Sequence, residues 1–207
     1  MKKICIDPGH PSYLRKTKKI NWGCVRDGVK EVELNLTLAN LLKNILRKKD
    51  FVTVLTRHDN KKVVSNEDRA KTAKDFNADL FLRIHANNRG DKNTIVNGVR
   101  TIYPPPTAKS ISVQSYAIAL SIHREIIKKT GLVDRGVCDE RITSRKNKLG
   151  MLTGTYWTNK YKIPTVLIET VYLSNPENRR WILKSANQKL MMEAVAKGIE
   201  QYFKENG

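Results

Sequence analysis

The sequence contains few cysteines, few aromatic residues and no long apolar run. Its three cysteines, Cys5, Cys24 and Cys138, are an odd number without Cys-x-x-Cys spacing, which argues against a disulfide framework and against a structural zinc knot. No apolar stretch approaches the roughly 20 residues that a membrane helix needs. Aromatic residues make up 7% of the chain, and no helix-turn-helix, zinc-finger or RNA-binding motif accompanies them. These absences argue against a membrane span and against specific recognition of nucleic acid.

Acidic residues are scarce as well. Lys and Arg together number 39 against 20 Asp and Glu, so the formal net charge is +19. Such a field attracts polyanions, whether nucleic acid, anionic lipid or an acidic wall polymer. The basic residues are scattered along the chain and form no tail, so a solvated basic surface without a partner is an equally open interpretation.

Length and composition indicate one soluble globular domain. A chain of 207 residues with 40% hydrophobic content can bury a sizeable core. No linker or repeat divides it, and we expect a single domain over residues 1–207. The segment Met1-Lys2-Lys3 is positively charged, but Asp7 and Pro8 interrupt the apolar stretch that follows, so we expect no secretory signal.

Strand and helix patterns alternate along the chain, which is typical of an α/β fold with a mainly parallel sheet. We predict a twisted sheet of about six strands flanked by helices. The predicted strands lie at 3–6, 52–56, 80–84, 98–103 and 165–169. The segment 131–161 has the least clear pattern, and we expect it to be a loop with one or two short strands. The predicted helices span 31–49, 110–129 and 185–204, one helix begins at the cap Ser65 and ends near Asn77, and a short one begins at Asn175. Residues 11–30 read as a basic loop.

Four side chains with metal-binding or proton-transferring chemistry stand at the ends of these elements. His10 follows the first strand, His85 follows the strand at 80–84, Glu169 ends the strand at 165–169, and Glu31 opens the first helix. Ligands gather at the carboxyl ends of the strands in an open α/β sheet, so we expect the four to meet at one edge. Two histidines and a glutamate make a catalytic zinc set, and a further glutamate can act as base. The sequence therefore predicts a zinc hydrolase.

Helical phase favours Glu31 over Glu33 as the inward-facing acid of the first helix. The apolar stripe of this helix consists of Leu34, Leu38, Leu41, Leu42 and Ile45. At about 100° per residue, Glu31 lies within about 40° of the centre of the stripe and Glu33 about 120° away. An inward carboxylate is costly to bury without a partner, and a metal is such a partner. The alternative is a helix-start acid stabilised by the helix dipole.

Each histidine taken singly also has a structural interpretation. His10 could be an ordinary turn residue, and His85 is ambiguous by itself. The remaining histidines are weaker candidates, because His58 lies just after the second strand and His123 lies inside a predicted helix.

Taken together, the motifs resemble the zinc-dependent N-acetylmuramoyl-L-alanine amidases of type 3, a family of peptidoglycan hydrolases. The matching segments occur in family order from residue 2 to about 203: Ile6-Asp7-Pro8-Gly9-His10, Glu31 with Asn35-Leu36, Leu55-Thr56-Arg57 with Asp59, Glu67-Asp68-Arg69-Ala70, Ala78-Asp79-Leu80-Phe81, Ile84-His85-Ala86-Asn87, Arg135-Gly136-Val137, and Val166-Leu167-Ile168-Glu169 with Ser174-Asn175. Any one of these motifs is weak evidence, whereas the ordered set is strong.

The resemblance implies that His10, Glu31 and His85 bind Zn²⁺ and that Glu169 is the catalytic acid–base. The implied reaction is hydrolysis of the amide that joins N-acetylmuramoyl residues to L-alanine in peptidoglycan. With three protein ligands, zinc keeps a position open for water. Glu169 would take a proton from this water and deliver it to the leaving amine.

Three positions depart from the family pattern. Pro11-Ser12 replaces the glycine pair that usually follows the first histidine. Arg83 stands where a small residue is common, and Thr170-Val171-Tyr172-Leu173 lacks the usual Gly-Phe. None of these is an implied ligand, so they affect the expected fit of the substrate rather than the chemistry.

Other functions remain open from the sequence. A zinc peptidase could use the same ligand set, although the His-Glu-x-x-His motif is absent. A nucleic-acid-binding protein is suggested by charge alone, and a catalytically inactive wall-binding module is disfavoured by the complete set of four residues. We expect an autolysin or a phage or prophage endolysin that is a monomer and stays cytoplasmic until lysis or non-Sec export. The basic surface could hold it to anionic wall polymers.

Overall fold

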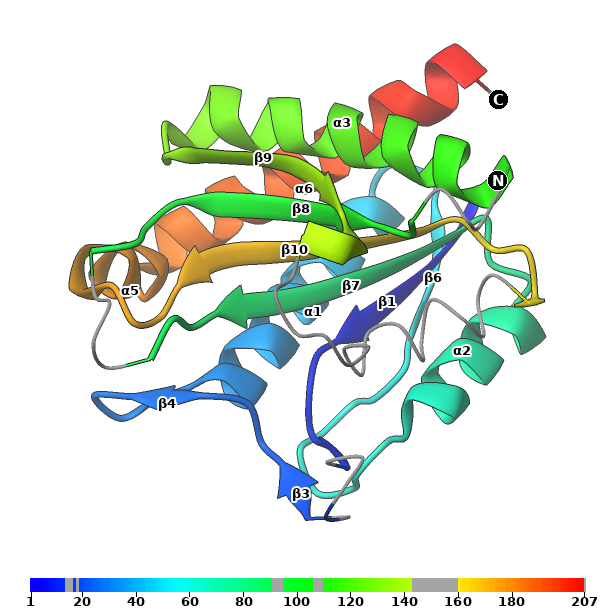
Figure 1. The fold of residues 1–207 in the computed structure, drawn as a ribbon. Helices are drawn as coiled ribbons and strands as arrows, with labels where there is room; N and C mark the ends of the chain where they lie inside the picture. Colours follow the sequence, from blue (N-terminus) through cyan, green and yellow to red (C-terminus); the bar gives the residue numbers. More distant parts are fainter. Residues whose placement is uncertain (14–16, 18, 91–94, 106–109, 143–159, 207) are drawn as a thin grey trace.

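The centre of the fold is a six-stranded sheet, seen in a computed structural model that describes residues 1–13, 17, 19–90, 95–105, 110–142 and 160–206. The strand order is β6-β1-β7-β10-β8-β9 (Figure 1). The strands are β1 (Lys3–Pro8), β6 (Val52–Leu55), β7 (Leu80–Asn87), β8 (Val99–Tyr103), β9 (Asp134–Asp139) and β10 (Thr165–Tyr172). All neighbouring pairs are parallel except β8 with β10. The predicted α/β class and the mainly parallel sheet of about six strands are confirmed.

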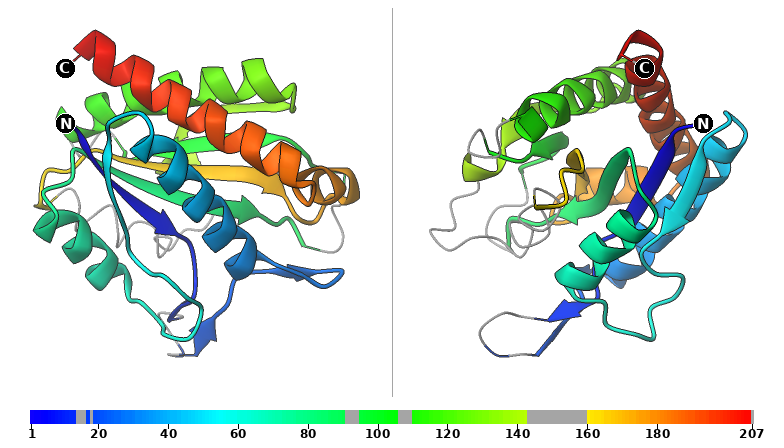
Figure 2. Two further views of the ribbon diagram at one scale, coloured as in Figure 1. Left: turned by 180° about the vertical axis from the view of Figure 1, so that it is seen from behind. Right: turned by 90° about the vertical axis from the view of Figure 1, so that its right-hand side faces the viewer.

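Helices cover both faces of this sheet. They are α1 (Glu31–Arg47), α2 (Asn66–Asp75), α3 (Ser110–Thr130), α5 (Pro176–Ile182) and α6 (Ser185–Asn206), and a 3₁₀ turn, η2 (Glu140–Ile142), follows β9. Figure 2 shows α1 and α6 side by side across one face, and α6 also packs along α3. The smaller helix α2 packs against β1 and β7. Among the described residues, no helix is long and apolar enough to span a membrane.

The alternation of side chains along the strands divides the interior into two clusters. Ile4 and Ile6 of β1 contribute to the large core beneath α1, α3 and α6. Cys5 and Phe81 point the other way, into a small cluster that includes Ala73 of α2. Successive side chains of a strand face opposite sides of the sheet. The odd-numbered residues of β7 and, as far as Glu169, those of β10 therefore share the face that the large core leaves free, and beyond Glu169 the register of β10 shifts.

The predicted helix starts are confirmed at two caps. The Ser65 hydroxyl oxygen accepts a hydrogen bond from the Asp68 backbone N–H at 3.0 Å, and α2 begins at the next residue. The Asn175 side-chain oxygen accepts from the Asn178 N–H at 2.9 Å, with Pro176 in the first turn of α5. Each cap satisfies an N–H group that has no partner within its own helix.

Several strand boundaries differ from the prediction. The strand predicted to end at residue 84 continues to Asn87, and the strand predicted to end at Glu169 continues to Tyr172. Hydrogen bonding between these two strands extends both, with the Leu173 N–H donating to the Asn87 carbonyl at 2.8 Å. The polar side chains His85 and Asn87 conceal this extension in the sequence, because a strand that runs along a site does not keep an apolar pattern.

Two further segments differ in detail. Residues 11–30, predicted as a loop, contain two short antiparallel pairs, β2 (Ser12–Tyr13) with β3 (Ile20–Asn21) and β4 (Val25–Arg26) with β5 (Val29–Lys30). In 131–161, the structure places one strand, β9, and the turn η2, whereas residues 143–159 lie outside the described part of the chain. Helix α1 ends at Arg47 rather than at residue 49.

Candidate metal centre

His10, Glu31 and His85 come together at the carboxyl end of the parallel strands, although the sequence separates them widely. His10 follows β1, Glu31 is the first residue of α1, and His85 lies on β7. One potential ligand atom from each residue lies within 4.8 Å of those of the other two. Within the described part of the chain, this is the group of side chains that meets the geometric requirement for a metal ion.

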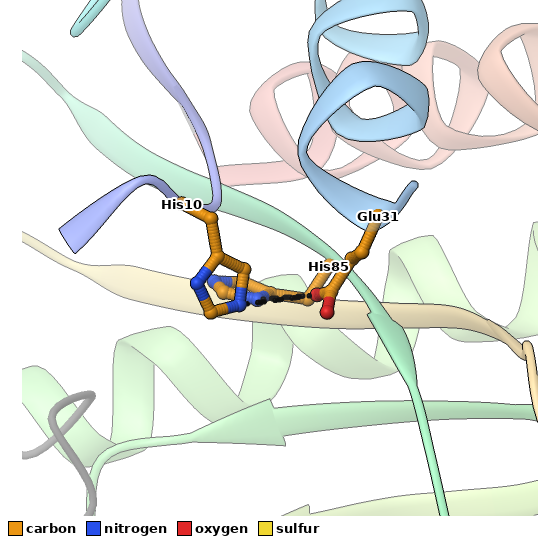
Figure 3. A group of neighbouring side chains, drawn as sticks. All are labelled: His10, Glu31 and His85. Atoms are coloured by element: carbon orange, nitrogen blue, oxygen red, sulfur yellow. Dashed lines mark hydrogen bonds and ion pairs between the residues drawn. The ribbon is translucent and has the colours of Figure 1, made fainter. Parts of the chain in front are cut away.

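The Glu31 carboxylate is the centre of the group. His10 Nε2 lies 3.3 Å and His85 Nδ1 lies 3.2 Å from the same oxygen, Glu31 Oε1 (Figure 3). The two imidazole rings meet edge to face, with centroids 5.1 Å apart. Two imidazoles and one carboxylate form a ligand set that zinc hydrolases use. The buried His85 Nε2 has no hydrogen-bond partner among the described residues, and a metal would satisfy this kind of atom. The residues therefore fit a zinc ion.

Backbone groups of the loop before α1 orient the ligands. His10 Nδ1 lies 3.2 Å from the Asn21 carbonyl oxygen. A hydrogen bond donated by Nδ1–H fixes the tautomer in which Nε2 keeps its lone pair for the centre. Glu31 Oε2 accepts a hydrogen bond from the Cys24 backbone N–H at 2.9 Å. The loop 11–30 therefore supplies hydrogen bonds that support His10 and Glu31. The sequence motifs did not predict this role for the loop.

Gly23 is required by the closeness of this loop to the ligands. Its φ is +81°, and a Cβ there would lie 2.6 Å from Glu31 Oε2 and 2.9 Å from His10 Cδ2. Only glycine combines this left-handed conformation with so close an approach. A glycine in the loop was visible in the sequence, but its proximity to the ligands was not.

The helical phase places the two acids of α1 as predicted. Glu31 is 5% exposed. Glu33 points to solvent, where its carboxylate pairs with Lys30 Nζ at 2.9 Å. Burial tends to raise the pKa of Glu31, but hydrogen bonds with His10 and His85 outweigh it and hold the pKa well below the usual value. The inward acid is thus ionised and can serve as a ligand.

His85 is neutral as a result of its burial. Burial lowers its pKa to about 4, a decrease that the hydrogen bond with Glu31 only partly opposes. A metal binds the unprotonated imidazole. The site therefore presents His85 in the protonation state that coordination needs, without a proton to displace at neutral pH.

The turn that carries His10 is held by two buried arginines. Arg57 donates to the Gly9 carbonyl oxygen at 3.0 Å, and Arg69 donates to those of Pro8 and Pro11 at 3.0 and 2.8 Å. These contacts fix the backbone on both sides of His10. They give a structural role to the Thr-Arg and Glu-Asp-Arg motifs of the sequence.

Asp7 balances the buried positive charge beneath this turn. Its carboxylate is fully buried and accepts hydrogen bonds from Arg69 and, at 2.8 Å, from Arg83 Nε. Burial raises the pKa of Asp7, but the charges of Arg69 and Arg83 outweigh this effect and lower it far below the usual value. Arg83, where the family commonly has a small residue, is thereby paired within the protein.

Glu169 lies next to the candidate metal centre, on the neighbouring strand. It is the register partner of His85, so the two side chains share one face of the sheet. Its Oε2 atom is buried without a hydrogen-bond partner among the described residues. Burial, and then the negative charge of Glu31, raises the pKa of Glu169 to about 8, while Arg100 and Arg83 oppose the increase. A carboxyl group with a pKa near neutrality is suited to proton transfer.

The other histidines lie away from the centre. His58 is exposed. His123 is buried in α3, where its ring lies 2.9 Å from Thr101 Oγ1 and 2.8 Å from Asp134 Oδ1. Both nitrogens of His123 are therefore occupied by contacts that join α3 to β8 and β9.

The thiols are not activated for catalysis. Burial, followed by the charge of Glu31, raises the pKa of Cys24 to about 12. Burial also raises the pKa of Cys5 and of Cys138. Since the thiolate is the nucleophile, these protonated thiols argue against a cysteine nucleophile.

Comparison with known proteins identifies the family. The profile of the N-acetylmuramoyl-L-alanine amidase family, Amidase_3, matches residues 4–201. The chain belongs to this family. The resemblance inferred from the motifs is confirmed by a match that covers nearly the whole chain, including the candidate metal ligands.

Individual proteins are similar over nearly the same length. LytC of Bacillus subtilis is 27% identical over 202 residues, which are 97% of this chain and 35% of LytC. The endolysin of Bacillus phage SPP1 is 26% identical and is covered to 65%. The chain therefore spans about a third to two thirds of these relatives. The solved structure of AmiC2 of Nostoc punctiforme matches with a TM-score of 0.76 and 26% identity, covering 98% of this chain and 97% of that one.

Proposed function

We propose that the protein is a zinc-dependent N-acetylmuramoyl-L-alanine amidase that hydrolyses the muramoyl–L-alanine amide of peptidoglycan. The observation that carries this proposal is the placement of Glu169 beside a group of two histidines and one glutamate. Metal-assisted amide hydrolysis uses a bound metal ion and an adjacent group that transfers a proton, and a carboxyl of raised pKa suits the second role. The named activities of LytC and of the other relatives support the choice of substrate.

His10, Glu31 and His85 would hold the zinc ion. When bound, it supplies a Lewis acid that polarises a carbonyl and activates water. Glu31, ionised and buried, contributes the negative charge of the ligand set, and Asn21 and Cys24 hold His10 and Glu31 in place. Because Arg57 and Arg69 fix the backbone around His10, little reorganisation of this turn would be needed for the zinc ion to bind.

Glu169 would carry the proton. As a base, its carboxylate accepts a proton from the attacking water. As an acid, it donates this proton to the departing alanine nitrogen, because an unprotonated amine anion is a poor leaving group. The negative charge of Glu31 contributes to the raised pKa of Glu169. A cation that neutralises Glu31 would move this pKa downward into the range where both roles are available.

The decisive experiment measures release of new alanine amino groups from purified peptidoglycan. We expect turnover by the zinc-loaded protein, loss of turnover with a chelator, and recovery on addition of Zn²⁺. Turnover that a chelator leaves unchanged would contradict the metal mechanism. Release of peptides cut elsewhere in the stem would assign a peptidase instead, and binding to wall without cleavage would assign a binding module.

We further propose that the basic surface holds the enzyme to anionic wall polymers. The formal net charge of +19 supports this role, since a field of one sign concentrates ligands of the opposite sign. Such attachment fits an enzyme that acts on the wall, either as an autolysin or as an endolysin.

A further inference from the structure

The strand order places Arg100 in line with His85 and Glu169. Glu169 of β10 is the register partner of His85 on one side and of Arg100 of β8 on the other. Residues directly opposite one another on neighbouring strands project to the same face. His85, Glu169 and Arg100 therefore form a row across three strands, running from the metal centre outward.

Among the described residues, the guanidinium group of Arg100 is anchored at one atom only. Its Nε donates to the Arg135 carbonyl oxygen at 3.4 Å. Within the part of the chain that the structure describes, its Nη atoms make no hydrogen bond or ion pair. Its positive charge acts on both Glu169 and Cys138, so the group lies close to the proposed acid–base. Partial exposure leaves it accessible to a ligand.

A bulge in β9 creates this anchor. Val99 pairs with Asp134 and Thr101 pairs with Val137, so Arg135 and Gly136 together oppose Arg100. Gly136 has a φ of +78°, a left-handed conformation that glycine adopts readily. Bulges beside active sites direct particular side chains, and here the bulge turns the Arg135 carbonyl toward Arg100.

Arg83, on the other flank of Glu169, provides a contrast. It is 4% exposed and is bound to Asp7 at 2.8 Å and to Asn66 at 3.1 Å. The protein thus uses Arg83 to balance its own buried carboxylate, whereas Arg100 has no carboxylate partner among the described residues.

On the basis of the proposed function, we infer that Arg100 binds a leaving peptide whose second residue carries a free carboxylate. The scissile carbonyl must face the metal ligands, and the scissile nitrogen must face Glu169, which protonates it. The leaving peptide then continues past Glu169 toward β8. Two extended residues span about 7 Å, and neighbouring strands are about 4.8 Å apart, so an arginine side chain one strand away reaches this carboxylate. Guanidinium and carboxylate groups form paired, charge-assisted hydrogen bonds.

Two synthetic substrates test the inference: N-acetylmuramoyl-L-alanyl-glycine, with a free α-carboxylate on the second residue, and its carboxamide. We expect the wild-type protein to prefer the acid by about 10- to 100-fold in kcat/KM, which is the usual effect of a charged hydrogen bond. Arg100→Gln should abolish this preference by slowing cleavage of the acid, with the amide changed by about threefold at most. Arg100→Lys should retain part of the preference, because lysine keeps the positive charge but lacks the paired N–H donors of the guanidinium group.

Arg124→Gln is the matched control, since it removes the same charge from an exposed position on α3 and should preserve the preference. Equal slowing of both substrates by Arg100→Gln, or no preference in the wild type, would overturn the inference. Binding of L-alanyl-glycine and its amide by calorimetry separates this inference from the proposed function. If the wild type cleaves neither substrate but binds the acid more tightly through Arg100, the inference stands and the amidase assignment fails.

Discussion

Gly9 packs so closely against the imidazole ring of His85 that no side chain fits between them. A Cβ at residue 9 would be 2.3 Å from Cε1 and 2.4 Å from Nε2 of this ring, distances at which one of the two groups must move. The turn that leads to His10 therefore also sets the position of the second histidine. The glycine of this turn is a requirement of the candidate metal centre, in addition to being a turn residue.

Gly9→Ala should displace the His85 ring and weaken zinc binding by about 10- to 100-fold, the usual effect of disturbing the support of a ligand. Competition with a chromogenic chelator measures this affinity. Gly198→Ala is the control. Its Cβ would lie 2.4 Å from Ile122 Cα, between α6 and α3, so it should lower the free energy of unfolding by about 1–3 kcal/mol and leave the zinc affinity unchanged. Wild-type affinity in Gly9→Ala would refute the steric argument.

Substitution of a metal ligand should remove metal and activity together. His85→Ala leaves two protein ligands, and we expect the purified variant to hold less than about a tenth of the zinc of the wild type, measured by elemental analysis, because a catalytic zinc site needs three. His58→Ala removes an exposed histidine and should retain full zinc content. Full occupancy in His85→Ala would show that the metal lies elsewhere.

Glu169→Gln should separate catalysis from binding. The amide keeps the shape of the side chain but cannot transfer the proton, so kcat should decrease by a factor of about 10² to 10⁴ at unchanged zinc content. Initial rates on purified peptidoglycan, with zinc measured in the same samples, provide the test. A variant with near-normal turnover would assign the proton transfer to another residue.

Asp7→Asn should destabilise the fold by about 3–5 kcal/mol, since it leaves Arg69 and Arg83 buried without their counter-charge. Because the pKa of Asp7 is lowered on folding, its ionised form stabilises the protein fully above the usual value of 3.8. This contribution is lost as the pH falls below that value toward the folded-state pKa. Urea unfolding of the zinc-free proteins should therefore show that the wild type has the higher free energy of unfolding, and that its advantage over Asp7→Asn narrows below about pH 3.8.

The exposed Asp75→Asn is the control for this comparison, and it should change stability by less than about 0.5 kcal/mol. An equally small effect of Asp7→Asn would mean that the two arginines find other partners.

Salt should weaken wall binding much more than it weakens catalysis on small substrates. Raising the ionic strength from 0.01 M to a few hundred millimolar shortens the Debye length from about 30 Å to below 10 Å. Sedimentation with purified wall should show steep loss of binding, whereas hydrolysis of soluble muropeptides should change little. Flat wall binding over this range would assign the basic surface to solubility alone. Tight, sequence-independent DNA binding without amide cleavage would favour a nucleic-acid-binding protein.

The sequence by itself determined the fold class and the identity of the candidate ligands. Apolar β-branched runs predicted strands β1 and β7. Helical phase distinguished the inward Glu31 from the exposed Glu33, and the caps Ser65 and Asn175 marked the starts of two helices. These features are local, because hydrogen bonds and apolar stripes within a few residues produce them. The order of the motifs then indicated the amidase family, which the profile match over residues 4–201 confirmed.

Only the tertiary structure decided how these residues cooperate. The proximity of Gly9 to His85, of Gly23 to Glu31, and of Arg100 to Glu169 depends on which strands and loops become neighbours. Strand order and bulges are set by packing over the whole sheet, and no short window of sequence contains this information. The extension of β7 past His85 and the pairing of Arg83 with Asp7 have the same origin. Side chains that look exceptional in the sequence acquire their roles from partners far away along the chain.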